Sequence, residues 1–132
     1  MRSLKNFKEI SVKTINTQYG VYDLLWTFPI KGIWLDKIVA GIKKHEYRDI
    51  KPYYVRRFLG KKALQASMFL VGEYPIPKTS NPPAVAFRAG YQPDSPYGVF
   101  ELKGLEIGYP NPEWTNQPDV RCFKLILGKQ IL

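Results

Sequence analysis

Between residues 33 and 50 the hydrophobic pattern changes from the period of a helix to that of a strand. Apolar residues first recur at helical spacing: Leu35, Ile38 and Val39. Gly41 then stands where a glycine with positive φ would end a helix. From Glu46 onward the period is two, so Glu46 and Arg48 point to the same side of a strand. The pattern predicts a helix that leads into a strand carrying opposite charges on one face.

Elsewhere, short apolar runs alternate with loops. Strands are expected over residues 7–15, 21–30, 46–50, 62–74, 84–89, 99–109 and 120–132. A basic, aromatic loop or short helix is expected over 52–62, and six of the eleven prolines fall between 74 and 98, which predicts loop around a single strand. The core should include Leu64, Met68, Leu70, Phe87, Phe123, Leu125 and Leu127. These elements predict an α+β fold, a small and mostly antiparallel β-barrel with one or two flanking helices.

Composition and charge indicate one domain with a basic surface. The chain has 132 residues, of which 45% are hydrophobic, enough to fill a single core. Its formal net charge is +9. Residues 31–62 hold ten Lys and Arg against three acidic residues, a local net charge of +7, so most of the excess surrounds the helix–strand stretch. A focused basic patch favours a partner rich in phosphate.

Cysteine and histidine content argues against several kinds of chemistry. The single Cys122 cannot form an internal disulfide. With the single His45, the chain has no cluster of Cys and His residues for zinc, and a catalytic triad would have only one possible histidine base. No metal or cofactor is therefore expected. No apolar run approaches the roughly 20 residues that cross a bilayer, and the first residues are not signal-like. A cytoplasmic protein without membrane contact is expected, as a monomer or weak homodimer.

The octet Gly-Ile-Lys-Lys-His-Glu-Tyr-Arg at residues 41–48 resembles the Gly-x-Lys-x-x-Glu-x-Arg signature of the ASCH domain, a member of the PUA-like superfamily. The helix and strand around the octet come in the family's order. The resemblance implies a PUA-like β-barrel core over residues 26–132, with residues 1–25 as an N-terminal extension. It also implies a cleft beside the motif that binds RNA or a nucleobase, and a hydrolase activity in some members.

This chain has only some of the residues that the hydrolases of the family use. Family members that deacylate N4-acetylcytidine use the motif lysine, here Lys43, with a threonine at the position that Glu46 occupies and a glutamate further along. This chain keeps the lysine and lacks the threonine, and a carboxylate is a poor replacement for a hydroxyl nucleophile. The candidates for the distant glutamate are Glu73, Glu101 and Glu106.

Three functions follow from these observations. In the first, the domain binds RNA or another single-stranded nucleic acid, and Glu46 with Arg48 contacts a base edge or ribose. Phosphates would be bound by Lys43, Lys44, Arg56, Arg57, Lys61 and Lys62, and bases would stack on Tyr53, Tyr54 or Trp114. In the second, Lys43 and Glu46 are the catalytic residues of a nucleoside amidohydrolase or a ribonuclease. In the third, the basic face binds an acidic protein partner.

Purely structural roles are the alternative for the same residues. Glu46 and Arg48 can simply pair across the mouth of the barrel. Lys43 and Lys44 can be solvated residues that interact with the helix C-terminal dipole. Trp34 is expected in the core, and His45 on the surface.

Overall fold

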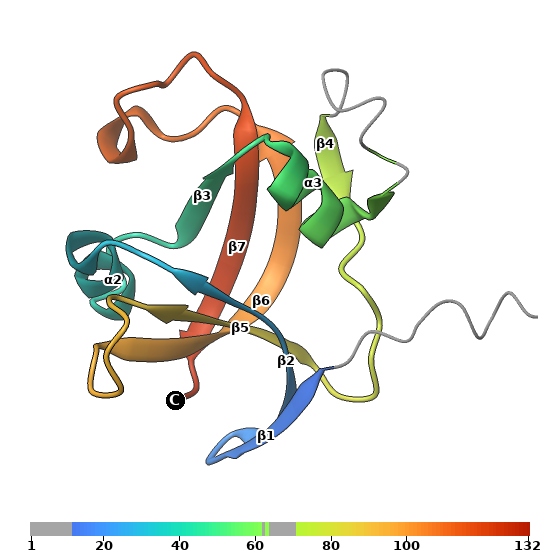
Figure 1. Ribbon diagram of the computed structural model, residues 1–132, viewed down its shortest axis with the longest axis vertical. Helices are drawn as coiled ribbons and strands as arrows, with labels where there is room; N and C mark the ends of the chain where they lie inside the picture. The colour runs from blue at the N-terminus through green and yellow to red at the C-terminus, as the bar shows by residue number, and fades with distance from the viewer. Residues whose placement is uncertain (1–11, 62, 64–70) are drawn as a thin grey trace, which may run out of the picture.

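The chain forms one curved sheet with helices beside it. The computed structural model describes residues 12–61, 63 and 71–132. Its strands are β1 (Lys13–Thr17), β2 (Gly20–Pro29), β3 (His45–Asp49), β4 (Gly72–Tyr74), β5 (Pro83–Arg88), β6 (Tyr97–Gly108) and β7 (Cys122–Gln130) (Figure 1). Its helices are α2 (Gly32–Val39), α3 (Pro52–Leu59) and the short 3₁₀ helix η2 (Pro112–Trp114). The expected α+β class is confirmed. Within the described ranges, no helix has the length and apolar character needed to span a membrane.

The strands are hydrogen-bonded in the order β1-β2-β5-β6-β7-β3, and β4 pairs with β6 outside this path. β2 and β5 run parallel, whereas the other pairs are antiparallel, so the sheet is mostly antiparallel as expected. β6 is long enough to pair with β5 through its first half and with β7 and β4 further along. This strand therefore connects both halves of the sheet.

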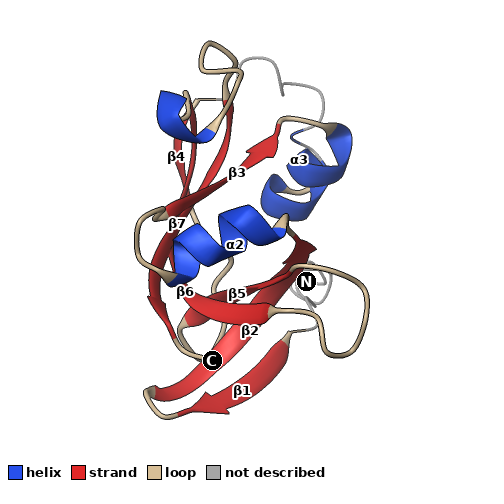
Figure 2. Ribbon diagram, turned by 90° about the vertical axis from the view of Figure 1, so that its left-hand side faces the viewer, coloured by secondary structure: helices blue, strands red, loops and turns tan. Residues whose placement is uncertain are grey.

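The sheet is not closed into a barrel, so that part of the expectation is wrong. β3 pairs with β7, and β2 pairs with β1 and β5, but among the described residues no backbone ladder joins β3 to β2. α2 lies between β3 and the strands β2 and β5 in both views (Figure 1, Figure 2). The helix thus occupies the side on which a barrel would have closed.

One main hydrophobic core lies between the sheet and the two α-helices. Four predicted core residues are buried: Phe87, Phe123, Leu125 and Leu127. The other three, Leu64, Met68 and Leu70, lie outside the described residues. α2 contributes Leu35 and Ile38, and α3 contributes Val55 and Phe58. Val39 was expected on the buried face but is exposed, because it is the last residue of α2 and the core contacts only the preceding turn.

Most predicted elements match the observed ones. The expected strands over 21–30, 46–50, 84–89, 99–109 and 120–132 correspond to β2, β3, β5, β6 and β7, and residues 52–59 form the helix α3. The expected strands over 7–15 and 62–74 lie largely outside the described residues. Strand β1 overlaps the end of the first of these ranges, and β4 overlaps the end of the second. The division expected at residue 25 falls inside β2, so strand pairing continues across it.

Candidate functional site

A tight turn connects α2 to β3 and positions the octet. Gly41 has φ of +78°, a conformation that favours glycine, and its N–H donates to the Ile38 carbonyl at 3.0 Å. The N–H groups of Ile42 and Lys43 both donate to the Lys37 carbonyl, at 3.0 and 3.1 Å. The predicted helix, glycine stop and strand are confirmed. Because the turn folds back on the helix end, the Lys43 side chain lies beside β3 instead of extending into water.

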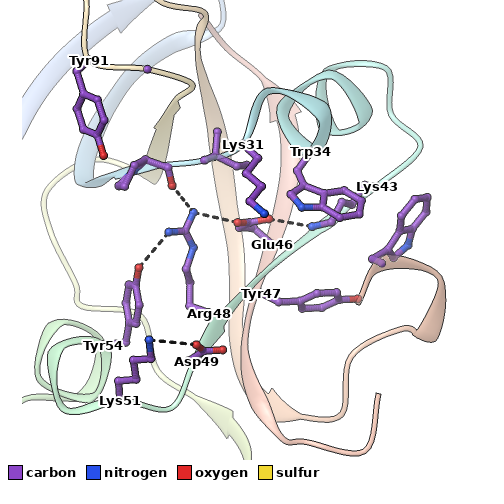
Figure 3. A pocket seen from close by; sticks show the side chains of 14 residues that line it. Lys31, Trp34, Lys43, Glu46, Tyr47, Arg48, Asp49, Lys51, Tyr54 and Tyr91 are labelled. Carbon is purple, nitrogen blue, oxygen red and sulfur yellow. Dashed lines mark hydrogen bonds and ion pairs between the residues drawn. The ribbon is translucent and has the colours of Figure 1, made fainter. Parts of the chain in front are cut away.

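Three charged side chains form a buried chain of ion pairs, here called the charge chain: Lys43, Glu46 and Arg48. Lys43 Nζ lies 2.9 Å from Glu46 Oε1, and Arg48 Nη2 lies 2.9 Å from Glu46 Oε2. Their side chains are 2%, 8% and 10% exposed. Figure 3 shows Glu46 between the two cations, both of which stabilise its negative charge. The alternation predicted from the sequence, with Glu46 and Arg48 on one face, is confirmed.

Arg48 also connects elements that the sheet does not join. Its Nη2 donates to the Pro29 carbonyl at the end of β2 at 2.7 Å, and its Nη1 donates to the Tyr54 hydroxyl of α3 at 3.0 Å. Its guanidinium lies 5.3 Å from the centroid of Phe28, a cation–π distance. Arg48 Nε is buried and has no hydrogen-bond partner. A side chain thus links β3 to β2 where a closed barrel would have backbone hydrogen bonds.

The charge chain lies at a cleft of about 500 Å³ (Figure 3). The residues around it come from β2, α2, β3, α3 and two loops: Pro29, Ile30, Lys31, Trp34, Lys43, Glu46, Tyr47, Arg48, Asp49, Lys51, Tyr54, Gly90, Tyr91 and Trp114. Four of them are cationic and two are carboxylates, so the lining has a formal charge of +2. The Tyr91 side chain is 92% exposed at the rim. A volume of this size fits a small organic ligand.

Aromatic rings form one wall of the cleft. The rings of Trp34 and Trp114 meet edge to face, with centroids 6.2 Å apart. The Lys43 ammonium lies 4.8 Å from the Tyr47 ring centroid and 5.8 Å from that of Trp34. The expectation that Trp34 belongs to the core is wrong, because Leu35 and Ile38 fill the core face of α2 and Trp34 is left half-buried at the cleft.

Among the predicted site residues, Lys43 has the environment that differs most from the prediction. Its ammonium donates to Glu46 and to the His45 carbonyl, and its side chain is nearly inaccessible to water. The solvated interpretation is therefore wrong for Lys43, whereas Lys44 is exposed. A buried ammonium with two acceptors orients the carboxylate of Glu46 and has little surface left for a phosphate.

The structure brings together only some of the predicted site residues. Lys43, Glu46, Arg48, Tyr54 and Trp114 line the cleft. The other predicted residues on and after α3 are not at the cleft: Tyr53, Arg56 and Arg57 surround a separate apolar cavity, Lys61 is exposed, and Lys62 lies outside the described residues. Tyr54, which is half-buried and packs against the core, is the α3 residue that lines the cleft.

Several cleft residues were not identified from the sequence. Lys31 and Lys51 contributed to the local basic excess, but nothing in the pattern placed them at the same cleft. Tyr47 alternates away from Glu46, and Tyr91 lies in a loop far along the chain. Asp49 is exposed and pairs with Lys51 at 3.4 Å. Only the tertiary fold could reveal these residues, since their positions depend on long-range packing.

None of the candidate downstream glutamates lies at the cleft. Glu73 is exposed on β4. Glu101 accepts a hydrogen bond from the Tyr22 hydroxyl at 2.8 Å, and Glu106 lies 3.8 Å from Lys124. The carboxylates at the cleft are Glu46 and Asp49, both from β3. Among the described residues there is also no group of three or more His, Cys, Asp or Glu side chains able to hold a metal ion.

Comparisons with protein-family models, curated proteins and solved structures find no match.

Proposed function

We propose that this chain is an ASCH-like domain with a PUA-like fold, and that it binds single-stranded RNA with one base in the cleft. The observation that carries the proposal is the charge chain at a cleft of about 500 Å³ that has aromatic walls. Proteins that recognise single-stranded RNA stack splayed bases on aromatic rings and hydrogen-bond their edges. The cleft offers both kinds of group.

In this proposal Glu46 recognises the base edge. Each of its carboxylate oxygens accepts one hydrogen bond from a cation, which fixes its orientation and leaves lone pairs for a donor on the ligand. An amino or imino N–H of a base is such a donor. The exposed ring of Tyr91 and the half-buried rings of Trp34 and Tyr54 supply stacking surfaces.

Phosphates would bind outside the charge chain. Lys31 and Lys51 lie at the cleft, and both are exposed. Among the described residues between 31 and 62, the other exposed cations are Lys44, Arg56, Arg57 and Lys61. Such side chains add affinity without sequence preference. Lys43 belongs to the site as a residue that positions Glu46.

The geometry favours binding over hydrolysis. A lysine base needs a free lone pair, whereas the Lys43 ammonium donates to two acceptors. The position of the expected threonine holds Glu46, and the remaining cleft carboxylate, Asp49, is exposed and paired with Lys51. We therefore expect no turnover of N4-acetylcytidine at about 1 per second or faster, the ordinary enzyme range, when deacetylation is followed by chromatography. Turnover at that rate, abolished in Lys43→Met, would make the chain an amidohydrolase.

Fluorescence anisotropy with labelled single-stranded RNA tests the proposal. Tyr91→Ser should raise the Kd at least fivefold, because stacking of one base on an aromatic ring contributes about 1–3 kcal/mol. Since Tyr91 is 92% exposed, the variant should fold like the parent protein. Tyr19→Ser is the matched control, because Tyr19 is an exposed tyrosine in the β1–β2 turn and does not line the cleft. Equal effects of the two substitutions, or no binding by the parent protein, would overturn the proposal.

A further inference from the structure

A second cavity adjoins the cleft and shares a wall with it. This side cavity has a volume of about 420 Å³. Tyr47 and Trp114 line both spaces, so their side chains form the partition between them. The backbone N–H of Asn111 donates to the Tyr47 hydroxyl at 3.1 Å, which attaches the loop after β6 to β3 and holds this partition. A ligand that occupies both spaces would have to pass around these two rings.

The side cavity differs from the cleft in the kinds of charged group that line it. Its ionisable nitrogen groups come from Lys44, His45 and Lys124, and among the described residues no carboxylate lines it. Glu106 lies 3.8 Å from Lys124 but is not part of the lining. The cleft, in contrast, contains Glu46 and Asp49. Lys44 and Lys124 would attract an anionic group attached to a ligand in the cleft, and no carboxylate among the described lining residues would oppose that attraction.

We propose that the side cavity binds the phosphodiester group next to the base held in the cleft, so that the domain recognises a dinucleotide unit of a single strand. This inference rests on the proposed function and adds the second half of its ligand. Lys44 and Lys124 would bind the phosphate oxygens as cations, and His45 would add an N–H donor. A nucleoside, which has no phosphate, would use only the cleft.

Because His45 lines the side cavity, affinity for the phosphodiester should depend on pH. Burial lowers the pKa of His45, and the charges of Lys124 and Lys43 lower it further, whereas Glu106 opposes them. The groups that face His45 are Lys43 and Lys44 from the turn, Tyr47 from β3, Glu106 from β6 and Lys124 from β7. A phosphodiester keeps one negative charge throughout the range of His45 titration and favours its protonated form. Affinity should therefore rise as the pH falls toward and below the ordinary histidine range.

Calorimetric titration with each of the four ribonucleosides and its NpN dinucleoside monophosphate tests this proposal. In the parent protein NpN should bind about tenfold more tightly than its nucleoside, and the double variant Lys44→Ser/Lys124→Met should lose that difference. Nucleoside affinity should stay within twofold. Lys103→Met is the matched control, because Lys103 also pairs with a glutamate, Glu101, at 3.6 Å, but lines neither cavity.

The pH arm compares pH 8 with pH 5.5. NpN should bind about threefold more tightly at pH 5.5, which requires the pKa of His45 to rise by at least about half a unit on binding, and His45→Gln should remove the effect. If nucleosides bind but NpN binds no better, and its affinity is unchanged by Lys44→Ser/Lys124→Met, the side cavity takes no phosphate and only this inference fails. If neither probe binds, the proposed function fails as well.

Discussion

Replacing Glu46 by leucine should destabilise the fold strongly. Glu46 lies between Lys43 and Arg48, with both ion pairs at 2.9 Å and all three side chains at least nine-tenths buried. Leucine has a similar volume and fits the low exposure of the site, so little packing is lost. What remains is two buried cations without a counter-ion, and removing one partner of a buried ion pair costs about 3–5 kcal/mol.

The lower end of that range is expected here, about 3 kcal/mol, because both cations keep other acceptors. Lys43 still donates to the His45 carbonyl, and Arg48 to the Pro29 carbonyl and the Tyr54 hydroxyl. For a domain of this size such a loss lowers Tm by roughly 10 °C. Urea unfolding followed by far-UV circular dichroism measures the free energy of unfolding, with an unchanged m-value indicating the same native and unfolded states.

Glu106→Leu is the control for the loss of an ion pair near the surface. Glu106 lies 3.8 Å from Lys124 with its side chain 36% exposed, so its loss should cost less than about 1 kcal/mol. Adding Lys43→Met to Glu46→Leu should restore at least about 1 kcal/mol, since one uncompensated charge disappears. Equal costs for Glu46→Leu and Glu106→Leu, or no recovery in the double variant, would show that the charge chain is well hydrated and would refute this reasoning.

Three further predictions concern binding, pH and the core. RNA affinity should fall with salt at a log–log slope of about −3 to −4, as about five phosphate contacts imply, and a flat titration would exclude a phosphate surface. Asp23 accepts hydrogen bonds from Asn81 and Thr14, chiefly from the Asn81 backbone, which lowers its pKa from 3.8 to about 2. Its stabilising effect is therefore complete above pH 4 and lost as the pH falls toward 2, and Asp23→Asn should flatten Tm over that window. Leu125→Ala should reduce the free energy of unfolding by about 2–5 kcal/mol in urea titrations, and a smaller loss would mean that β7 contributes little to the core.

Local patterns predicted the framework of the site. The change of hydrophobic period predicted α2 and β3, and Gly41 predicted the turn between them. The alternation along the strand predicted that Glu46 and Arg48 lie on the same face. These features depend on residues close in sequence and on backbone geometry that a glycine or an alternating pattern specifies. The composition of the core could be predicted for the same reason, because β5 and β7 have clear apolar patterns.

Long-range features could not be predicted in this way. The burial of Lys43 depends on where a flexible side chain finds a carboxylate and a carbonyl. The positions of Tyr91 and Trp114 depend on loops whose local sequence signals only turns and prolines. The open edge of the sheet arises because α2 lies between β3 and β2, and no periodicity encodes that arrangement.

The parallel pairing of β2 with β5 has a consequence for folding kinetics. Phe28 lies opposite Phe87, so a long intervening segment must be closed before these strands can pair, and non-local pairing of this kind slows folding. The cleft also depends on contacts between residues far apart in the sequence. Arg48 donates to the Pro29 carbonyl at the end of β2, and its own strand, β3, pairs with β7 near the other end of the chain. During refolding, ligand binding should thus reappear no earlier than the full far-UV circular dichroism signal of the native protein. A peptide of residues 33–50 would contain the octet at 41–48 without forming the cleft.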